Sequence, residues 1–366
     1  MSDIPATPKA YIAGIGMITS IGADAPSTAA AVNAEVSGYQ LSSFFNKQGK
    51  PMTLATVPSD VFSLVEVEID TGAYYSAQYD HIIKMAVIAL SEALRTAVTK
   101  QSIKHPIPLI LALPEEHERK NHIPIDLLIH NLLKQGHLPL KKEWIHCLST
   151  GRAAGIQGME LALKALYQQG YDHVLIGGSD SYLNAARLGV LDKDERVLAS
   201  NRMDGFAPGE GAGFLLLTRH PQQALSHNNT IIALSSPGIS EEPGHIYANE
   251  EQTYRGDGLD LAFKAALKDH SGADIQRIYS SMNGEHYWAK EFGVALLRNQ
   301  GHFKDPTTMA HPADCYGDLG AAAGPVLIGL AATHLLKQAD VASHMVYSSS
   351  DGPFRAAVRV EKITTT

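Results

Sequence analysis

Cysteine is scarce in this sequence, and its scarcity excludes two classes of protein. Only Cys147 and Cys315 occur among 366 residues, and they lie far apart. Two cysteines at that separation form neither a disulfide scaffold nor a cysteine-rich zinc module. H-x-x-x-H and H-x-H spacings are typical of metal ligands, and the 17 histidines show neither. We therefore expect no metal site and a reducing compartment.

Basic clusters, targeting signals and nucleotide-binding motifs are also missing. The 38 acidic residues outnumber the 30 basic ones, and no basic block occurs, so we expect no nucleic-acid partner. Residues 1–8 lack the basic and apolar regions of a signal peptide, which predicts a cytoplasmic protein. Gly14 and Gly16 follow a predicted strand, but the third glycine of a dinucleotide loop is absent, and there is no P-loop. We expect no cofactor.

One apolar stretch is nearly long enough to span a membrane. Residues 319–336 read LGAAAGPVLIGLAATHLL, close to the ~20 residues that a bilayer requires. The stretch is rich in glycine and alanine, contains Pro325 and His334, and directly follows Asp318. These features favour a fully buried central helix, with no membrane contact.

Predicted strands and helices alternate along the chain, which is typical of an α/β fold. Short apolar runs predict strands, and apolar residues at helical spacing predict helices. The predicted strands are 9–16, 107–113, 144–148, 174–178 and 213–218, and the predicted helices are 25–36, 86–98, 123–133 and 155–169.

The sequence contains an internal repeat, which accounts for many of its 31 glycines. Residues 151–155 (GRAAG) and 317–324 (GDLGAAAG) each open an apolar helix, and a strand follows each helix. We predict two related halves, residues 1–220 and 221–366. Helices this rich in small residues pack closely on all sides, as at the centre of a multilayer sandwich.

Four blocks in sequence order resemble β-ketoacyl synthases. Residues 204–213 (DGFAPGEGAG) resemble the D-G-F-x-x-G-E-G-A-G block of that family. Residues 12–22, 176–181 and 317–324 resemble its first strand, its glycine-rich strand end and its second histidine motif. The resemblance implies the thiolase fold, a five-layer αβαβα sandwich of two pseudo-symmetric halves. It also implies a homodimer or heterodimer formed through residues 144–148.

The family's catalytic residues are replaced at all three positions. Condensation requires a thiolate at a helix N-terminus and two histidines that stabilise the developing enolate. The resemblance places Arg152, or its neighbour Ala153, at the nucleophile, Asn283 at the first histidine and Asp318 at the second. Asn283 donates a hydrogen bond but takes no proton, and an anionic Asp318 opposes an enolate. Three replacements argue against Claisen condensation.

We predict that the replaced positions and their neighbours share one cleft. The simpler hypothesis is an Arg152–Asp318 salt bridge that fills a vacated pocket, and the alternative is a new catalytic set. Glu285 beside His286 is a candidate acid–base pair. Cys147 and Cys315 are expected to be buried structural thiols. The candidate binding residues are Cys147, Arg152, Asn283, Glu285, His286, Asp318 and Phe354, the last in a loop that replaces the family's F-G-F-G-G.

The leading functional hypothesis is a pseudoenzyme that works by binding another protein. One family pattern is the non-catalytic, chain-length-factor-type partner of a ketosynthase, bound to a ketosynthase or acyl carrier protein. The other is the thiolase-like proteins of type VI secretion clusters, which share the motifs at 151–155, 177–181 and 204–210 and are thought to act as adaptors or co-chaperones for effectors. The alternative is an active 3-oxoacyl-ACP synthase or other acyltransferase, with Cys147, Ser149 or Thr150 as nucleophile.

Overall fold

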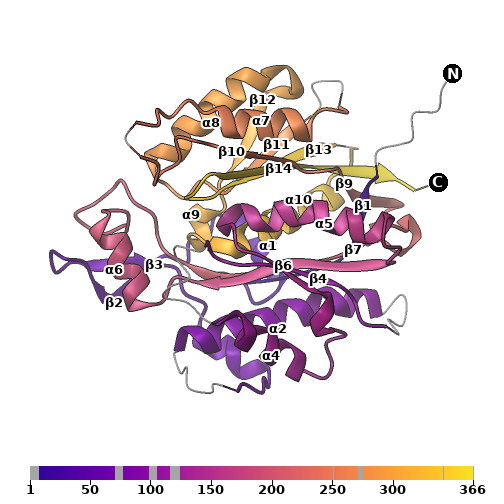
Figure 1. Ribbon diagram of the computed structural model, residues 1–366, viewed down its shortest axis with the longest axis horizontal. Helices are drawn as coiled ribbons and strands as arrows, with labels where there is room; N and C mark the ends of the chain where they lie inside the picture. The colour runs from indigo at the N-terminus through magenta and orange to yellow at the C-terminus, as the bar shows by residue number, and fades with distance from the viewer. Residues whose placement is uncertain are drawn as a thin grey trace.

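Three layers of helices alternate with two layers of strands (Figure 1). The computed structural model describes residues 8–70, 77–98, 105–115, 124–249, 251–270, 275–340 and 342–365. From one face to the other, the helical layers are α7 (Asp257–Ala266) with α8 (His286–Asn299), then α5 (Ala154–Tyr167) with α10 (Ala323–Lys337), then α2 (Ala77–Val98) with α4 (Ile125–Lys134). The predicted five-layer αβαβα sandwich is confirmed.

The two strand layers have the same order and the same directions. In the first layer the order is β5 (Ile145–Leu148), β4 (Leu109–Ala112), β6 (His173–Ser181), β7 (Glu210–Thr218), β1 (Ala10–Thr19). In the second layer the order is β12 (Phe303–Ala310), β11 (Ile275–Ser280), β13 (Ser343–Ser349), β14 (Phe354–Thr364), β9 (Thr230–Leu234). In each layer the first three strands are parallel and the last two pairings are antiparallel. The halves are therefore pseudo-symmetric.

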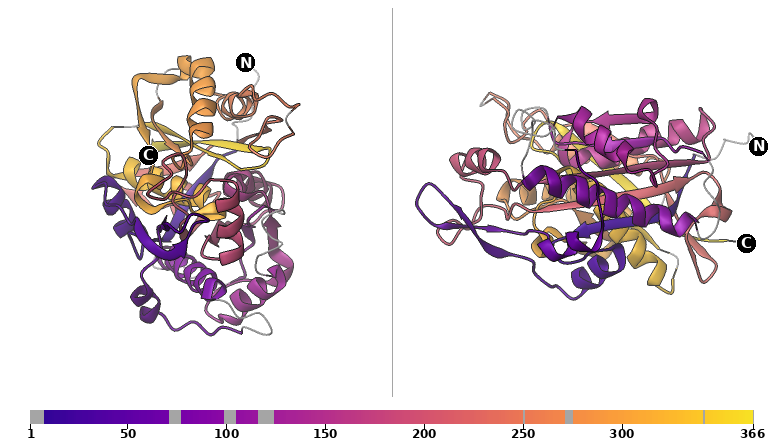
Figure 2. Two further views of the ribbon diagram at one scale, coloured as in Figure 1. Left: turned by 90° about the vertical axis from the view of Figure 1, so that its left-hand side faces the viewer. Right: turned by 90° about the horizontal axis from the view of Figure 1, so that it is seen from below.

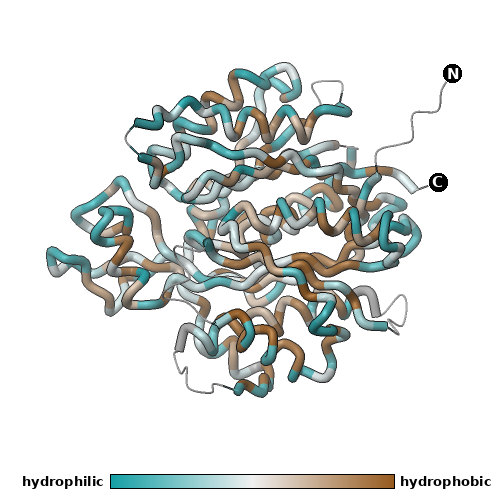
Figure 3. Tube along the Cα trace, viewed as in Figure 1, coloured by the Kyte–Doolittle hydropathy of each residue, from teal (hydrophilic) through white to brown (hydrophobic). Residues whose placement is uncertain are grey.

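The layers join where β1 pairs with β9, through Ala10 opposite Leu234. The predicted boundary at residue 220 lies between β7 and β8 (Ser226–His227). Hydrophobic residues concentrate along the strands and inner helices, and hydrophilic residues on the outermost turns (Figure 3).

The two central helices pack closely enough to require glycine. A Cβ on Gly155 of α5 would lie 2.3 Å from Cδ of Pro325 of α10. Each helix is preceded by a 3₁₀ turn, η3 (Gly151–Ala153) and η6 (Gly320–Ala322), and each turn begins with a glycine at positive φ, 66° and 52°. Within the described residues, Gly320–Lys337 is the one segment with the length and composition to cross a membrane, and 78% of it is buried inside the protein. The predicted buried central helix is confirmed.

Several predicted boundaries are wrong, and close packing explains the clearest case. The first strand was expected to end at Gly16, but β1 continues to Thr19 and α2 begins nine residues before the predicted start at residue 86. Gly14 and Gly16 lie inside β1 and do not end it. Glycine is required at both positions by close packing, because a Cβ on either would lie 1.9 Å from a backbone oxygen of α2. The predicted start of a helix at Ile123 lies outside the described residues.

Other elements were not predicted. The hairpin of β2 (Gln40–Phe45) and β3 (Pro51–Leu54) projects from the molecule beside α6 (Ala185–Lys193) (Figures 1 and 2). The remaining unpredicted elements include β10 (Gly238–Glu241) and α9 (Ala313–Tyr316). The predicted helix α1 (Ala25–Asn33) is present but ends three residues before its predicted limit.

Candidate functional site

The three replaced positions come together between the two halves. Arg152 belongs to η3, Asn283 follows β11, and Asp318 lies between α9 and η6. The Arg152 guanidinium contacts Oδ2 of Asp318 through Nε at 2.8 Å and through Nη2 at 2.5 Å. The Asn283 amide donates to the same oxygen at 2.8 Å. The ion pair expected between Arg152 and Asp318 is therefore present.

Arg196, Asp351 and Glu285 extend this ion pair into a network. Nη1 of Arg152 donates to Oδ1 of Asp351 at 2.6 Å, and Arg196 contacts both oxygens of the same carboxylate at 2.7 and 3.0 Å. Arg196 also donates from Nε and Nη2 to the two oxygens of Glu285, at 2.7 and 2.8 Å. We call Arg152, Arg196, Glu285, Asp318 and Asp351 the charge cluster.

Neutral donors complete the coordination of the carboxylates. The backbone N–H of Gly320 donates to Asp318 at 2.9 Å, and the indole N–H of Trp288 donates to Glu285 at 3.0 Å. The Trp288 ring also lies 5.4 Å from the Arg152 guanidinium, a cation–π distance.

Every member of the charge cluster is buried. Arg152 and Asp318 are each 3% exposed, and the most exposed member, Glu285, is 7% exposed. Burial alone would raise the pKa of the Asp351 carboxyl, but Arg152 and Arg196 outweigh burial and hold that pKa well below its usual value. Burial likewise opposes the charge of Arg152, and Asp318 and Asp351 outweigh it, so the pKa of Arg152 is raised. Asp351 and Arg152 therefore stay ionised at neutral pH.

The chemistry of the Arg152 side chain differs from that of a nucleophile. A guanidinium carries five donors, no acceptor and a permanent charge, so it attacks no thioester carbonyl. Asp318 fills the position where the resemblance implies a histidine, and its two oxygens are held by Arg152, Asn283 and Gly320. The side chains fill the pocket with paired charge.

The structure separates Glu285 from His286. Glu285 points into the charge cluster, whereas the His286 side chain is 84% exposed and its Nδ1 lies 2.7 Å from Asp204. The two residues start α8, where consecutive side chains point in different directions. The hypothesis of a Glu285–His286 acid–base pair is therefore wrong, and His286 lies outside the cluster.

The two cysteines and Phe354 occupy three different environments. Cys147 is exposed, contrary to the expected buried thiol, because β5 is the last strand of its layer. Cys315 is buried, as expected, and burial together with Asp314 raises its thiol pKa. Phe354 begins β14 and packs half-buried against the central core.

Arg196 and Asp351 were missed as site residues. Asp351 had a detectable signal, because the repeat aligns it with Asp180, which is also buried and ion-paired, to Arg187 at 2.9 Å. No sequence signal marked Arg196, because its partners Glu285 and Asp351 lie 89 and 155 residues away in sequence.

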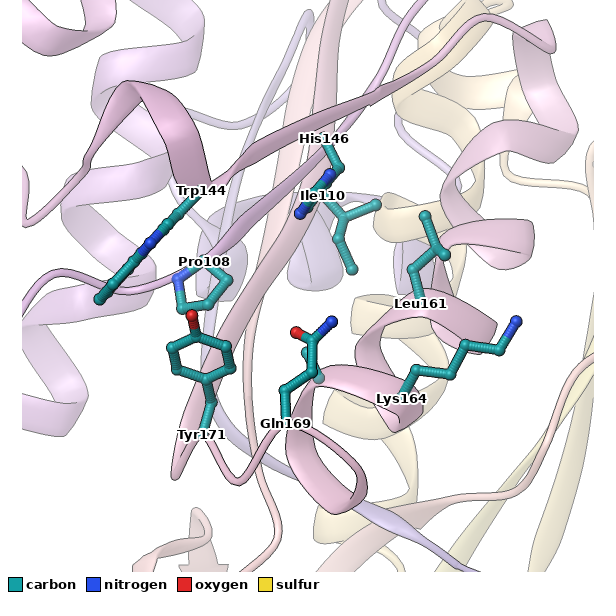
Figure 4. A pocket seen from close by; sticks show the side chains of 9 residues that line it. Pro108, Ile110, Trp144, His146, Leu161, Lys164, Gln169 and Tyr171 are labelled. Atoms are coloured by element: carbon teal, nitrogen blue, oxygen red, sulfur yellow. The ribbon is translucent and has the colours of Figure 1, made fainter.

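Two of the cavities formed by the described residues lie away from the charge cluster. One of about 120 Å³ lies beside β5 and is lined by Trp144, His146, Lys164, Tyr171 and neighbouring apolar residues (Figure 4). The other, of about 570 Å³, lies between β11, β12, α1 and α10. Among the residues that the structure describes, no group of three or more histidine, cysteine, aspartate or glutamate side chains is arranged to hold a metal ion.

Comparisons of the sequence match part of the chain to known proteins. Residues 145–223 match the model of the β-ketoacyl synthase N-terminal domain, a segment that runs from β5 past Arg152 and Arg196. A stretch of 102 residues is 29% identical to the polyketide synthase PksL of Bacillus subtilis strain 168. That stretch is 26% of this chain and 2% of PksL, so the chain spans a very small part of the relative's length.

Solved ketosynthase structures match nearly the whole chain. The ishigamide ketosynthase/chain length factor has a TM-score of 0.72 at 17% identity, over 99% of this chain and 100% of that one. The ketosynthase ApeO in complex with its chain length factor ApeC, from Xenorhabdus doucetiae, gives 0.69 at 17% identity, over 99% and 100%. The complex of the ketosynthase AntDE with the acyl-carrier protein AntF gives 0.74 at 14% identity, over 97% and 99%.

These matches define the class of the molecule. The chain has the thiolase fold, as the resemblance predicted, and it is β-ketoacyl synthase-like.

Proposed function

We propose that this protein is a catalytically inactive, ketosynthase-like protein that acts by binding another protein. The charge cluster is the observation that carries the proposal. At the expected nucleophile position Arg152 is 3% exposed and ion-paired to Asp318 and Asp351. A substrate thioester at that place would have to separate buried opposite charges, which is strongly unfavourable.

One of the two edge strands lacks the features that normally protect an edge from pairing with another chain. In the described part of the chain, β5 and β12 end the strand order. β12 contains Lys304, Asp305 and Pro306, residue types that protect an edge from pairing. β5 has the sequence IHCL and none of these features. We therefore propose that a homodimer or heterodimer forms through β5, next to the helix that Arg152 begins.

Two classes of partner are candidates. The leading one is a secretion effector or its adaptor, which the motifs at residues 151–155, 177–181 and 204–210 support through their likeness to type VI secretion proteins. The second is a catalytic ketosynthase, with this chain in the role of a chain length factor. That candidate is favoured because two of the matched structures are ketosynthases with their chain length factors.

Intact mass spectrometry tests the absence of catalysis. The full chain is incubated with acyl thioesters of an acyl carrier protein, beside an active ketosynthase as a positive control. We expect no acyl adduct on this chain. A stable adduct on Cys147, Ser149 or Thr150 would instead establish an acyltransferase.

Affinity purification from the native host, followed by mass spectrometry, separates the candidate partners. Stoichiometric recovery of a ketosynthase or an acyl carrier protein supports the chain-length-factor role. Recovery of secretion components supports the adaptor role. Recovery of the chain alone, as a monomer, contradicts both.

A further inference from the structure

The cavity of about 570 Å³ has charged groups of opposite sign at its two ends. Arg277 and His334 lie at one end, with Tyr279 between them and the other end. Asp314 and Glu35 line the other end near Cys315, and both are exposed. We call this space the bipolar cavity.

The basic end contains a guanidinium without a carboxylate partner and a buried nitrogen without a hydrogen-bond partner. The guanidinium of Arg277 lies 5.9 Å from the Tyr279 ring and hydrogen-bonds to the Tyr279 side chain, but Arg277 forms no ion pair with a carboxylate among the described residues. Nδ1 of His334 is buried and has no hydrogen-bond partner among the described residues. A guanidinium without a carboxylate is suited to bind an anion in bidentate geometry.

His344 provides a second, independent sign of an unfilled polar site. It is fully buried, and both of its ring nitrogens lack a hydrogen-bond partner in the described part of the chain. Its ring lies 5.2 Å from that of His334 and 5.6 Å from that of Tyr279, which both line the bipolar cavity. Buried polar atoms are almost always hydrogen-bonded, so orphans beside a cavity point to a polar occupant.

The internal repeat provides a cavity in the first half for comparison. The smaller cavity near β5 is formed by β4, β5 and α5, the counterparts of β11, β12 and α10 (Figure 4). In that cavity Trp144 and Tyr171 pack edge to face, and Lys164 is ion-paired to Glu160 at 2.8 Å. No carboxylate is among the residues that line this smaller cavity, so the combination of basic and acidic lining residues occurs in the second-half cavity.

We propose that the bipolar cavity binds a small zwitterion, with its carboxylate on Arg277 and His334 and its ammonium group near Asp314 and Glu35. The two carboxylates repel a simple anion in the cavity, whereas they attract an ammonium group. Arg277 and Tyr279 are two residues apart on β11, about 7 Å along the strand, and α9 lies beyond Tyr279. The two charges of the ligand are therefore at least that far apart.

Isothermal titration calorimetry of the full chain with 6-aminohexanoate tests this binding. We expect saturable binding of 6-aminohexanoate. The affinities for glycine and for hexanoate should each be at least tenfold lower, because glycine is too short and hexanoate lacks the ammonium group. Arg277→Ala and the size-matched Arg277→Gln should each weaken 6-aminohexanoate at least tenfold. Arg255→Ala, which removes a 76% exposed arginine, is the control and should bind normally.

The double variant Glu35→Gln/Asp314→Asn tests the two carboxylates separately. It should reduce the affinity for 6-aminohexanoate to the level of the affinity for hexanoate, and it should not reduce the affinity for hexanoate. Thermal melts establish that each variant is folded. The proposal is overturned if 6-aminohexanoate shows no saturable heat at tens of millimolar. It is also overturned if hexanoate binds as tightly, or if a folded Arg277 variant binds as well as the original chain.

Discussion

Arg152 carries its positive charge where water is excluded, and its carboxylate partners are what make that charge tolerable. Two guanidinium groups face three carboxylates in the charge cluster, with Asn283, Trp288 and the Gly320 N–H supplying further donors. A buried ion network of this kind adds little net stability compared with an apolar filling, but removing one member leaves its partners uncompensated.

Arg152→Met should therefore be strongly destabilising, although methionine fills much of the same space. We expect the free energy of unfolding to fall by about 3–5 kcal/mol, measured by urea denaturation. Adding Asp318→Asn should recover part of this loss, because it removes one uncompensated carboxylate. A cost under about 0.5 kcal/mol, which is typical of surface substitutions, would contradict the role assigned to the network.

His344 makes stability depend on pH in a predictable direction. Burial, followed by His334 and Arg277, lowers its pKa from 6.5 to about 3. The unfolded chain thus binds a proton between these values that the folded chain does not. Its contribution to stability is present above pH 6.5 and is lost as the pH falls toward 3.

Replacing His344 with leucine should flatten this dependence. Between pH 4 and 6, the slope of unfolding free energy against pH should decrease by up to about 1.4 kcal/mol per pH unit, the value for one proton. Chemical denaturation at several pH values measures both slopes. Equal slopes in the two proteins would show that His344 is protonated in the folded state.

At the scale of elements, the two central helices depend on glycine for their close approach. Gly155→Ala would place a Cβ 2.3 Å from Pro325, a proline ring that has no alternative rotamer to escape the clash. We expect a loss of about 1–3 kcal/mol, or more if α5 shifts.

Gly189 of α6 is the matched control for that substitution. Nothing lies within 4 Å of the Cβ that alanine would add there. Gly189→Ala should raise stability by up to about 1 kcal/mol through helix propensity. Thermal melts of the two variants should move in opposite directions, and shifts of equal sign would refute the packing argument.

The same elements show how far the sequence predicts the structure. Apolar runs located the core strands, and the repeat located the turns that begin α5 and α10. The hairpin β2–β3 was missed because β2 has no buried residues and β3 buries only Met52 and Leu54, so neither strand forms an apolar run. At the site, motif positions identified Arg152, Asn283 and Asp318, whereas Arg196 depends on contacts that only folding creates.

At the scale of the whole molecule, the two ends of the strand order differ. Cys147→Asp adds a charge to the exposed strand β5 without filling the interior, and Cys147→Ser is its matched control. If a second chain pairs along β5, the aspartate variant should be monomeric because burying an unpaired charge opposes pairing. Size-exclusion chromatography with light scattering measures the mass. A Cys147→Asp variant that remains dimeric would show that the interface does not lie along β5.

The contrast between β5 and β12 also limits the kinds of assembly that this chain can form. If β5 of one molecule paired with β12 of the next, every addition would expose a fresh edge and the chains would grow into a fibre. Pro306 and its charged neighbours block that route. A β5-to-β5 contact uses both open edges at once and leaves nothing to extend, so the sheet can double but not polymerise.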